Sequence, residues 1–388
     1  MSVRVNKSSF NIREKLSELG RKFGLKGSEL VAAETAQEAR DLVSAGRKNL
    51  VINGDMRISQ RVGTTSTNIA QGGYLLDRFR GNYWNGGSMT SQQVTDAPPG
   101  FHNSMKLTVT STDTSIASGD YRYFRQIIEG NNINHLNWGS SNAKTVTLSF
   151  WVRSSIIGTH AGSVWNDGFN RSFPFDYLIN FADTWEHKSI TVPGCPDGTW
   201  ETGLSRGINV AFVQVCGSSY TGTPHQWNNA GDMGPTNHVN LLATNGATWY
   251  ITGIQLEVGK NATDFEHRQY GEELALCQRY YYLHVFVEGS NQKSIANAAA
   301  YSSGAAFGVV HFPTTMRAIP TLEVANVANA YRIFINGSSQ LFNSFSTQEA
   351  SENAFTLERG SLSLTQGHAG WFRMNDEPGA RIAFSAEL

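Results

Sequence analysis

Alternation of apolar and polar side chains is the clearest pattern along this chain, and it predicts β-strands. In residues 145–153 the apolar side chains at the even positions from Val146 to Val152 would face one way, and Trp151 with its hydroxyl-bearing neighbours would face the other. Similar runs predict further strands at 105–110, 121–128, 185–192, 208–215 and 248–258. We expect each of them to bury one face in a core.

The alternation changes phase once within a predicted strand. In 248–258, apolar residues at 249 and 251 are followed by apolar residues at 254, 256 and 258. One extra residue near Gly253 restores the two-residue period, so the pattern predicts a β-bulge there.

Short strands separated by Gly- and Asn-rich turns, with no helices between them, are typical of an antiparallel sandwich or barrel. The chain returns to this pattern after residue 283, with strands expected near 308–312, 320–327, 331–335, 354–358, 370–374 and 380–387. Between the two β regions, residues 269–282 predict a linker with a short helix around 272–279, with Leu274 and Cys277 facing inward. The sequence contains no repeat of fixed period, which argues against a β-helix or a propeller.

Residues 1–48 have a different pattern and predict two short helices. Asn11 to Glu14 form a capping box before the first helix, and the second helix follows Ser28. Helices this short are marginal alone, so we expect a partner surface to stabilise them. Four apolar side chains on their faces are the expected docking residues: Ile12, Leu16, Leu19 and Val43. The predicted domains are therefore 1–48 (a helical anchor), 49–268 (a β-sandwich), 269–282 (a linker helix) and 283–388 (a second β-domain).

Composition narrows the class of protein further. The 388 residues are enough for two or three folded units, and charged residues make up only 16% with a net charge of −1. We therefore expect neither nucleic-acid binding nor membrane insertion, since there is no basic excess and no apolar run of about 20 residues. The N-terminus lacks the apolar core of a secretory signal. Three cysteines without C-x-x-C spacing are expected to be reduced thiols made in a cytoplasm.

Motifs for catalysis are missing from the sequence. It lacks a Walker loop, a G-x-S-x-G elbow and an H-E-x-x-H helix, so we expect no catalytic residue, no cofactor and no metal. His225, His238 and Asp232 share one loop, and we interpret the histidines as solvated. Glycoside hydrolysis by paired carboxylates is the enzymatic alternative, and its candidates are scattered acids: Asp167, Asp176, Asp183, Glu186 and Asp197.

Aromatic residues in polar loops are the stronger signal. The segments 111–120, 158–172 and 217–238 are long for loops of a compact domain, and long loops on a rigid sandwich often carry binding. A loop Trp beside amides can stack on a sugar ring while the amides bond its hydroxyl groups. The candidates for glycan binding are four: Trp165, Trp200, Trp227 and Tyr220. Trp151 and Trp249 lie in predicted strands, and we expect them to serve packing.

Several phrases in the sequence resemble tail-fibre and appendage proteins of tailed bacteriophages, particularly those of marine cyanobacteria. The first phrases are VNKSSFNIREKLSEL (5–19), NLVINGDMRISQR (49–61) and YLLDRFR (74–80). The later phrases are ITGIQLEVGKNATDFEHR (251–268), ELALCQRYYY (273–282), HFPTTMRAIPTLEV (311–324) and ARIAFSAEL (380–388). Each phrase is short, but their order spans both ends of every predicted unit.

The resemblance implies a mainly β protein: an antiparallel jelly-roll sandwich and a second C-terminal β-sandwich domain, preceded by a short helical N-terminal anchor. It implies a homotrimer that is assembled in the host cytoplasm into the virion. Its N-terminus would bind other virion structural proteins of the tail or capsid, and its β-domains would bind host surface glycan or lipopolysaccharide. The alternative is a capsid-decorating fibre or an adaptor with a purely structural role; a capsule depolymerase comes third.

Overall fold

The computed structural model describes residues 47–388 apart from residues 85, 290–291 and 326. The chain divides into two units, Met1–Lys48 and Asn49–Leu388. The predicted helices with Ile12, Leu16, Leu19 and Val43 lie outside the described residues. Within the described residues, no helix has the length and apolarity needed to cross a membrane.

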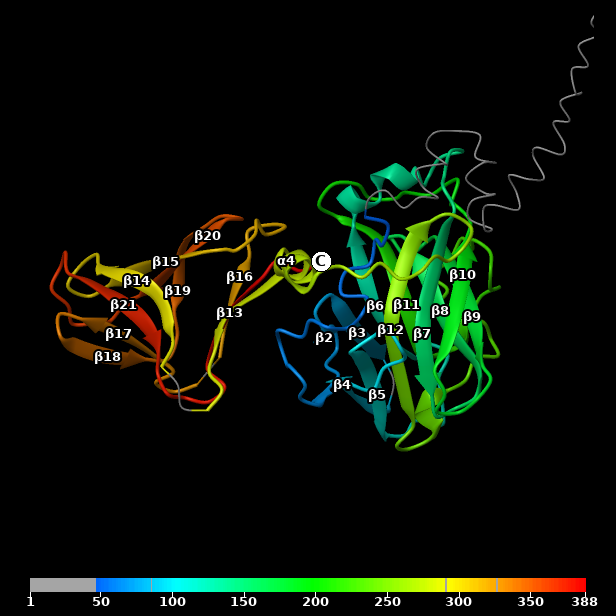
Figure 1. The fold of residues 1–388 in the computed structure, drawn as a ribbon, viewed down its shortest axis with the longest axis horizontal. Helices are drawn as coiled ribbons and strands as arrows, with labels where there is room; N and C mark the ends of the chain where they lie inside the picture. The colour runs from blue at the N-terminus through cyan, green and yellow to red at the C-terminus, as the bar shows by residue number, and fades with distance from the viewer. Residues whose placement is uncertain (1–46, 85, 290–291, 326) are drawn as a thin grey trace, which may run out of the picture. The chain divides into compact units, whose positions relative to one another are not determined.

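The first half of the second unit is a jelly-roll sandwich of two six-stranded antiparallel sheets (Figure 1). One sheet, here called sheet A, has the order β1-β4-β5-β12-β7-β10, and the other, sheet B, has the order β2-β3-β6-β11-β8-β9. The strands of sheet A are β1 (Thr67–Asn68), β4 (Ser88–Val94), β5 (Ser104–Ser111), β12 (Thr248–Val258), β7 (Val146–Ser154) and β10 (Glu186–Val192). Those of sheet B are β2 (Tyr74–Leu76), β3 (Phe79–Trp84), β6 (Tyr121–Glu129), β11 (Arg206–Cys216), β8 (Gly158–Trp165) and β9 (Ser172–Ile179). The apolar rows of both sheets meet in one large core.

Helix α4 (Tyr270–Gln278) follows the jelly roll, and a second sandwich with its own core begins at β13 (Tyr281–Phe286). A three-stranded sheet, β13-β22-β16, packs there with a seven-stranded sheet, β18-β17-β21-β14-β15-β20-β19, here called sheet E. The remaining strands are β14 (Ser294–Ala300), β15 (Ala306–His311), β16 (Thr321–Val324), β17 (Tyr331–Ile335), β18 (Ser338–Phe342), β19 (Ser346–Ala350), β20 (Ala354–Arg359), β21 (Ala369–Met374) and β22 (Arg381–Ser385). The predicted fold class is therefore confirmed over the described residues.

The predicted strands match the structure to within a few residues, and β17 and β12 begin and end where the alternation places them. The predicted bulge is also confirmed, because the pairing of β12 with β7 shifts between Thr252 and Gln255. The linker helix covers Tyr270–Gln278, within two residues of the predicted 272–279. Tyr281 and Tyr282, at the end of the predicted linker, already pair with β22.

The expectation that 158–172 is one long loop is wrong. Residues 158–165 form β8, which turns into β9 at Ser172. Both faces of β8 are covered, so small residues replace the usual alternation. At Gly162 a Cβ atom would lie 2.3 Å from the Phe175 ring. A strand that is packed closely on both faces shows no alternation of apolar and polar residues, so it could not be recognised from the sequence.

The two ends of the jelly roll are tied together by buried polar contacts. The Asn49 side chain donates to the Ile254 carbonyl at 3.0 Å and accepts from the backbone N–H groups of Val51 and Leu256. Its backbone N–H donates to the Glu266 carboxylate at 2.7 Å. These contacts hold the segment 259–268 across the outer face of sheet A, where it borders the site described next.

Glu387 connects the C-terminal strand to the jelly roll. Its carboxylate pairs with the buried Arg78 and, at 3.3 Å, with Arg61. The Tyr280 ring packs beneath the Arg78 guanidinium, within a small apolar cluster that contains residues of both halves. The jelly roll and the second sandwich are therefore in direct contact.

Candidate functional site

A hollow of about 400 Å³ on the outer face of sheet A gathers exposed aromatic rings. Its floor is Trp151 of β7, and one wall is His187, its register partner on β10, whose ring lies 5.2 Å away. The other wall is a cluster of Phe101, Phe265 and His267, whose ring centroids lie 5.0–5.4 Å apart. This hollow (Trp151, His187, Phe101, Phe265 and His267) is called the aromatic hollow below.

The bulge at Gly253 creates the space between the two groups of rings. Gly253 has a φ of +63°, a conformation that favours glycine. A Cβ atom there would lie 2.7 Å from the Phe101 ring and 3.1 Å from Trp151 Cδ1. Any other residue would therefore push the rings apart and fill the hollow from below.

Apolar rings alternate in the hollow with groups that form hydrogen bonds, and no lysine or arginine is among the described residues that line it. Ser149 and Thr263, which carry hydroxyl groups, and Asp264, which carries a carboxylate, are among its lining residues. Partial burial lowers the pKa of His187, which keeps its imidazole neutral near pH 7. An aromatic floor with uncharged or mildly acidic polar walls suits a neutral polyhydroxylated ligand.

Trp151 corrects the expectation that both strand-borne tryptophans serve packing. Trp249 does so, since it is 1% exposed and lies against Phe124 and Phe212 in the main core. Trp151 is half-buried on the opposite face of the same sheet. The alternation in 145–153 already placed it there, because its position is out of phase with the apolar row.

Trp200 and Trp227 were predicted as sugar platforms, and the structure instead places them with Trp138 in a packed triad. The three rings lie edge to face, with centroids 4.6–5.5 Å apart. Every indole N–H donates to a backbone carbonyl: that of Trp138 to Lys144, that of Trp200 to Asp197 and that of Trp227 to Pro193. Trp200 is buried, so for this residue the prediction is wrong; Trp227 is half-buried, with Phe173 on its remaining side.

Trp165 and Tyr220 lie under or within the segment 217–238, which folds down over the outer face of sheet B. Trp165 is 2% exposed and packs between Tyr123 and Phe169. Tyr220 is half-buried, edge-on against Tyr121. The prediction of Trp165 as a loop platform is therefore wrong: it ends strand β8 and forms the centre of a small second core. The loop is long because it covers this core.

The candidate acids are distributed among separate contacts. Asp167 pairs with Arg206 at 3.7 Å, Asp176 with His225 at 2.8 Å, and Asp197 with Arg171. Hydrogen bonds from Lys188, Phe181 and Asn180 lower the pKa of Glu186 to about 2 against the opposing effect of burial. Asp183 lies in a turn, where its N–H donates to the Ser154 carbonyl. Among the described residues, no three His, Cys, Asp or Glu side chains are arranged to hold a metal.

His238 has a structural role that its loop position did not reveal. Its Nε2 accepts a hydrogen bond from the backbone N–H of Cys216 at 3.0 Å, so the proton of the neutral ring resides on Nδ1. Nδ1–H then donates to the Pro235 carbonyl at 2.7 Å. The interpretation of His238 as a solvated histidine is wrong, while His225 lies exposed at the surface.

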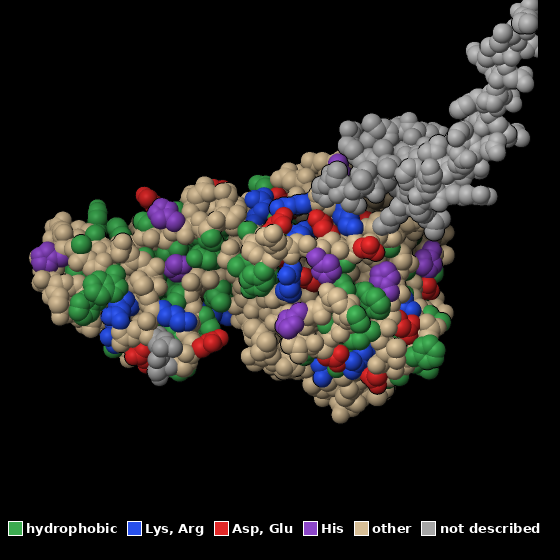
Figure 2. Space-filling model, in the orientation of Figure 1, with side chains coloured by type: hydrophobic (Ala, Val, Ile, Leu, Met, Phe, Trp, Pro, Cys, Tyr) green, Lys and Arg blue, Asp and Glu red, His purple; other side chains and the backbone are tan. Residues whose placement is uncertain are grey.

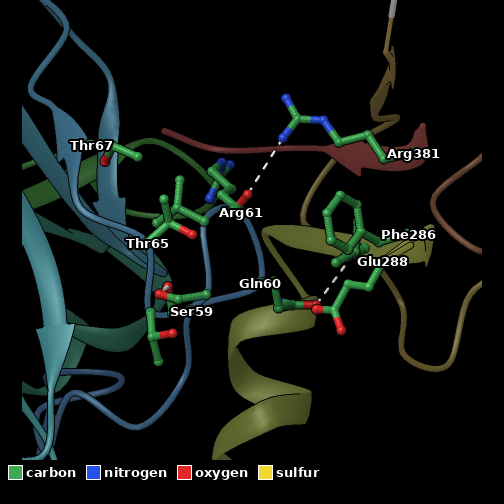
Figure 3. Close-up of a pocket in the computed structure, with 12 residues that line it drawn as sticks. Ser59, Gln60, Arg61, Thr65, Thr67, Phe286, Glu288 and Arg381 are labelled. Atoms are coloured by element: carbon green, nitrogen blue, oxygen red, sulfur yellow. Dashed lines mark hydrogen bonds between the residues drawn. The ribbon is translucent and has the colours of Figure 1, made fainter. Parts of the chain in front are cut away.

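A second hollow, of about 410 Å³, lies where the turn 59–67 meets β13 and β22 (Figure 3). Hydroxyl groups of Ser59, Thr65 and Thr67 line one side, and Phe286, Glu288 and Arg381 line the other (Figure 3). Its central cation, Arg61, is already engaged: it pairs with Glu387 and lies over the rings of Tyr74 and Tyr281. This hollow therefore offers one aromatic edge and few uncommitted groups, and the aromatic hollow is the better candidate.

Known structures resemble this fold over about half of the chain. A carbohydrate-binding module of family 4 aligns with 52% of this chain and 100% of its own, at 14% identity and a TM-score of 0.28. A family 61 module in complex with β-1,4-galactotriose aligns with 55% of this chain and 100% of its own, at 10% identity and a TM-score of 0.27.

The enzymatically active domain of tailspike protein 4 of bacteriophage CBA120 aligns with 54% of this chain at 13% identity and a TM-score of 0.29. The alignment spans only 21% of that tailspike chain. No protein-family model and no curated protein sequence matches this chain. Similarities this distant do not transfer a function, which must be argued from the residues of the site.

Proposed function

We propose that this chain is a virion appendage of a tailed bacteriophage, a homotrimeric fibre whose jelly roll binds a glycan of the host surface. The binding site is the aromatic hollow. Residues 1–48 attach the fibre to other virion proteins, and the β-domains remain free to meet the cell. The role is recognition rather than catalysis.

The observation that carries glycan binding is the half-exposed Trp151 ring at the floor of the aromatic hollow. The Trp151 ring lies outside the core, so much of its apolar surface is exposed to water. A ligand that covers the ring removes this surface from water, and this burial favours binding. Stacking of one pyranose ring is worth about 1–2 kcal/mol at ~25 cal/mol per Å². One site would therefore bind weakly, and several copies in one fibre would raise the affinity through avidity.

Two further features support the placement in a virion. The sequence phrases described above lie at both ends of each predicted unit and resemble phage fibre proteins. The chain also has few charged residues, which make up 16% of the sequence, and charged side chains are scattered over the face shown in Figure 2. Such a surface suits a particle exposed to variable salt, because few of its contacts depend on ionic strength.

Binding of the purified full-length protein to an array of bacterial lipopolysaccharides, capsular polysaccharides and neutral oligosaccharides tests the proposal. Trp151→Ala and Phe101→Ala should each weaken binding several-fold or more. The matched control is Trp84→Ala, which removes a highly exposed tryptophan of the same sandwich from outside the hollow. Trp84→Ala should bind like the unchanged protein.

Three outcomes would contradict the proposal. Unchanged binding in both hollow variants would place recognition elsewhere. A protein that binds no glycan but binds capsid or tail proteins would be a decorating fibre or an adaptor. Release of reducing ends from the polysaccharides would indicate a depolymerase.

A further inference from the structure

The outer face of sheet E carries partly exposed side chains, aromatic ones among them. Its other face is buried in the second core, where Ile333 and Phe372 are fully inaccessible. The residues in the opposite phase point outward, among them Trp371 at 36% exposed and Val309 at 46%. In Figure 2 hydrophobic and basic side chains lie beside one another on this half of the molecule.

Two of the outward aromatic residues form a pair. Phe334 of β17 and Trp371 of β21 are direct cross-strand partners, and their ring centroids lie 4.8 Å apart at an angle of 40°. Asn297 on β14 is the next residue along the same cross-strand row, and it is exposed. The row thus offers an apolar surface with an amide at its side.

The next cross-strand row brings two arginines together. Arg332 of β17 and Arg373 of β21 are also direct register partners. Like charges in this position destabilise a sheet. Their hydrogen bonds go to amide oxygens, Arg332 to Asn375 and Arg373 to Gln292. Neither guanidinium forms an ion pair with any carboxylate of the described residues.

One donor of Arg332 is also unsatisfied, because its Nε atom is buried and lacks a hydrogen-bond partner. The Arg373 guanidinium lies 5.8 Å from the Trp371 ring, so the charged row directly adjoins the aromatic one. Two uncompensated positive charges beside an exposed aromatic pair form a surface complementary to an anion that also has an apolar face.

We infer that the outer face of sheet E binds an acidic saccharide, a sugar residue that carries a carboxylate, sulfate or phosphate. The sugar ring stacks on Trp371 and Phe334, and the acidic group accepts hydrogen bonds from Arg332 and Arg373. This site is independent of the aromatic hollow, whose lining has no cation. The contrast predicts that the two sandwiches prefer different ligands, neutral in the first and anionic in the second.

A single-stranded nucleic acid also combines aromatic and anionic groups, but the arginine pair fits it less well. Proteins that bind single strands follow the backbone with a groove of positive charge. Here the two paired arginines lie in a single cross-strand row, and the whole chain has a net charge of −1. A short acidic sugar needs only this one row.

Titration of the full-length protein with polygalacturonate tests the inference, with the fully methyl-esterified polymer as a matched uncharged probe. We expect polygalacturonate to bind at low salt at least tenfold more tightly than its ester and to lose affinity as salt rises. Arg332→Gln with Arg373→Gln should abolish that preference, and Trp371→Ala should weaken binding of the acid several-fold. Arg206→Gln, on the first sandwich, is the matched charge control, and it should have no effect. A melting temperature for each variant confirms that it is folded.

Equal affinity for acid and ester, or unchanged binding in the arginine and Trp371 variants, would overturn the inference. So would tighter binding of single-stranded DNA than of polygalacturonate. Trp151→Ala separates this site from the aromatic hollow, because it should leave polygalacturonate binding intact. A loss confined to Trp151→Ala would support the aromatic hollow and refute the site on sheet E.

Discussion

At the scale of single residues, Trp151 and Trp249 show how one sheet uses the same side chain for two purposes. Trp249→Ala removes a fully buried indole and should lower the free energy of unfolding by about 3–5 kcal/mol. Trp151→Ala removes a half-exposed ring and should cost roughly 1 kcal/mol or less. Urea denaturation followed by circular dichroism measures both. A large loss at Trp151 would mean that its ring stabilises the fold and is not reserved for a ligand.

His238 should make the cover over sheet B sensitive to pH. Burial lowers the pKa of the His238 imidazole below its ordinary value of 6.5, and the ring accepts a hydrogen bond that only its neutral form can accept. The unfolded chain therefore binds a proton below about pH 6.5 that the folded chain resists, so this contribution to stability falls as pH drops through that window. The hydrogen-exchange protection factors of residues 217–238, which compare each observed rate with the intrinsic rate at the same pH, should fall between pH 7 and pH 5.5.

The variant His238→Gln separates this effect from general acid destabilisation. A glutamine side chain can both accept from Cys216 and donate to Pro235, but it does not titrate. The protection factors of 217–238 in the variant should be nearly independent of pH over this window. An equal loss of protection in the variant and the unchanged protein would show that other groups control the segment.

At the scale of elements, the hydrogen bonds of Asn49 should be the main contacts that join the two ends of the jelly roll. Asn49→Ala leaves the buried N–H groups of Val51 and Leu256 without their acceptor. Each unsatisfied group costs about 1–3 kcal/mol, so thermal unfolding should begin well below that of the unchanged protein. Asn261→Ala, at an exposed position of the adjacent segment, is the control and should melt normally. Equal melting of the two variants would show that Asn49 is dispensable.

Strands with one face in a core could be predicted from the sequence, because their period is visible in the residues themselves. This holds for β7, β12 and β17. It fails for β8, whose two covered faces require Gly162 and other small residues, and for β19, an edge strand that is polar apart from Ala350. A period exists only where the two faces of a strand meet different environments.

The site residues were harder to predict because a loop position does not imply exposure. Trp200 and Trp165 stand among polar residues in the sequence, yet backbone carbonyls or neighbouring rings enclose them. Whether a loop folds back depends on contacts between distant residues, such as Trp138 with Trp227. Only Trp151 could have been recognised as a site residue from the sequence. It is an aromatic residue on the polar face of a strand whose apolar and polar positions alternate clearly.

At the scale of the whole molecule, the proposed fibre requires several copies of the chain. Glycan contacts of 1–2 kcal/mol per ring are too weak to hold a particle on a cell unless they act together. We expect light scattering at micromolar concentration to give a mass three times the chain's 42.6 kDa. A monodisperse monomer of the full-length chain would contradict the trimer.

We propose that residues 1–48 attach the chain to the virion and that the β-domains bind glycan. This proposal predicts the properties of a chain that begins at Asn49. The boundary between the two units falls between Lys48 and Asn49. Asn49, with its hydrogen bonds to the jelly roll, and both β cores lie on the C-terminal side. The shortened chain should therefore retain its β-type circular dichroism and melt within about 2 °C of the full-length protein, since both β cores are retained. It should still bind the glycan recognised by the aromatic hollow but fail to join virus particles, because the apolar stripes that include Ile12 and Leu16 are gone. Particle incorporation, measured by quantitative mass spectrometry of purified virions, decides the point: incorporation at the normal copy number would show that the β-domains themselves attach to the virion.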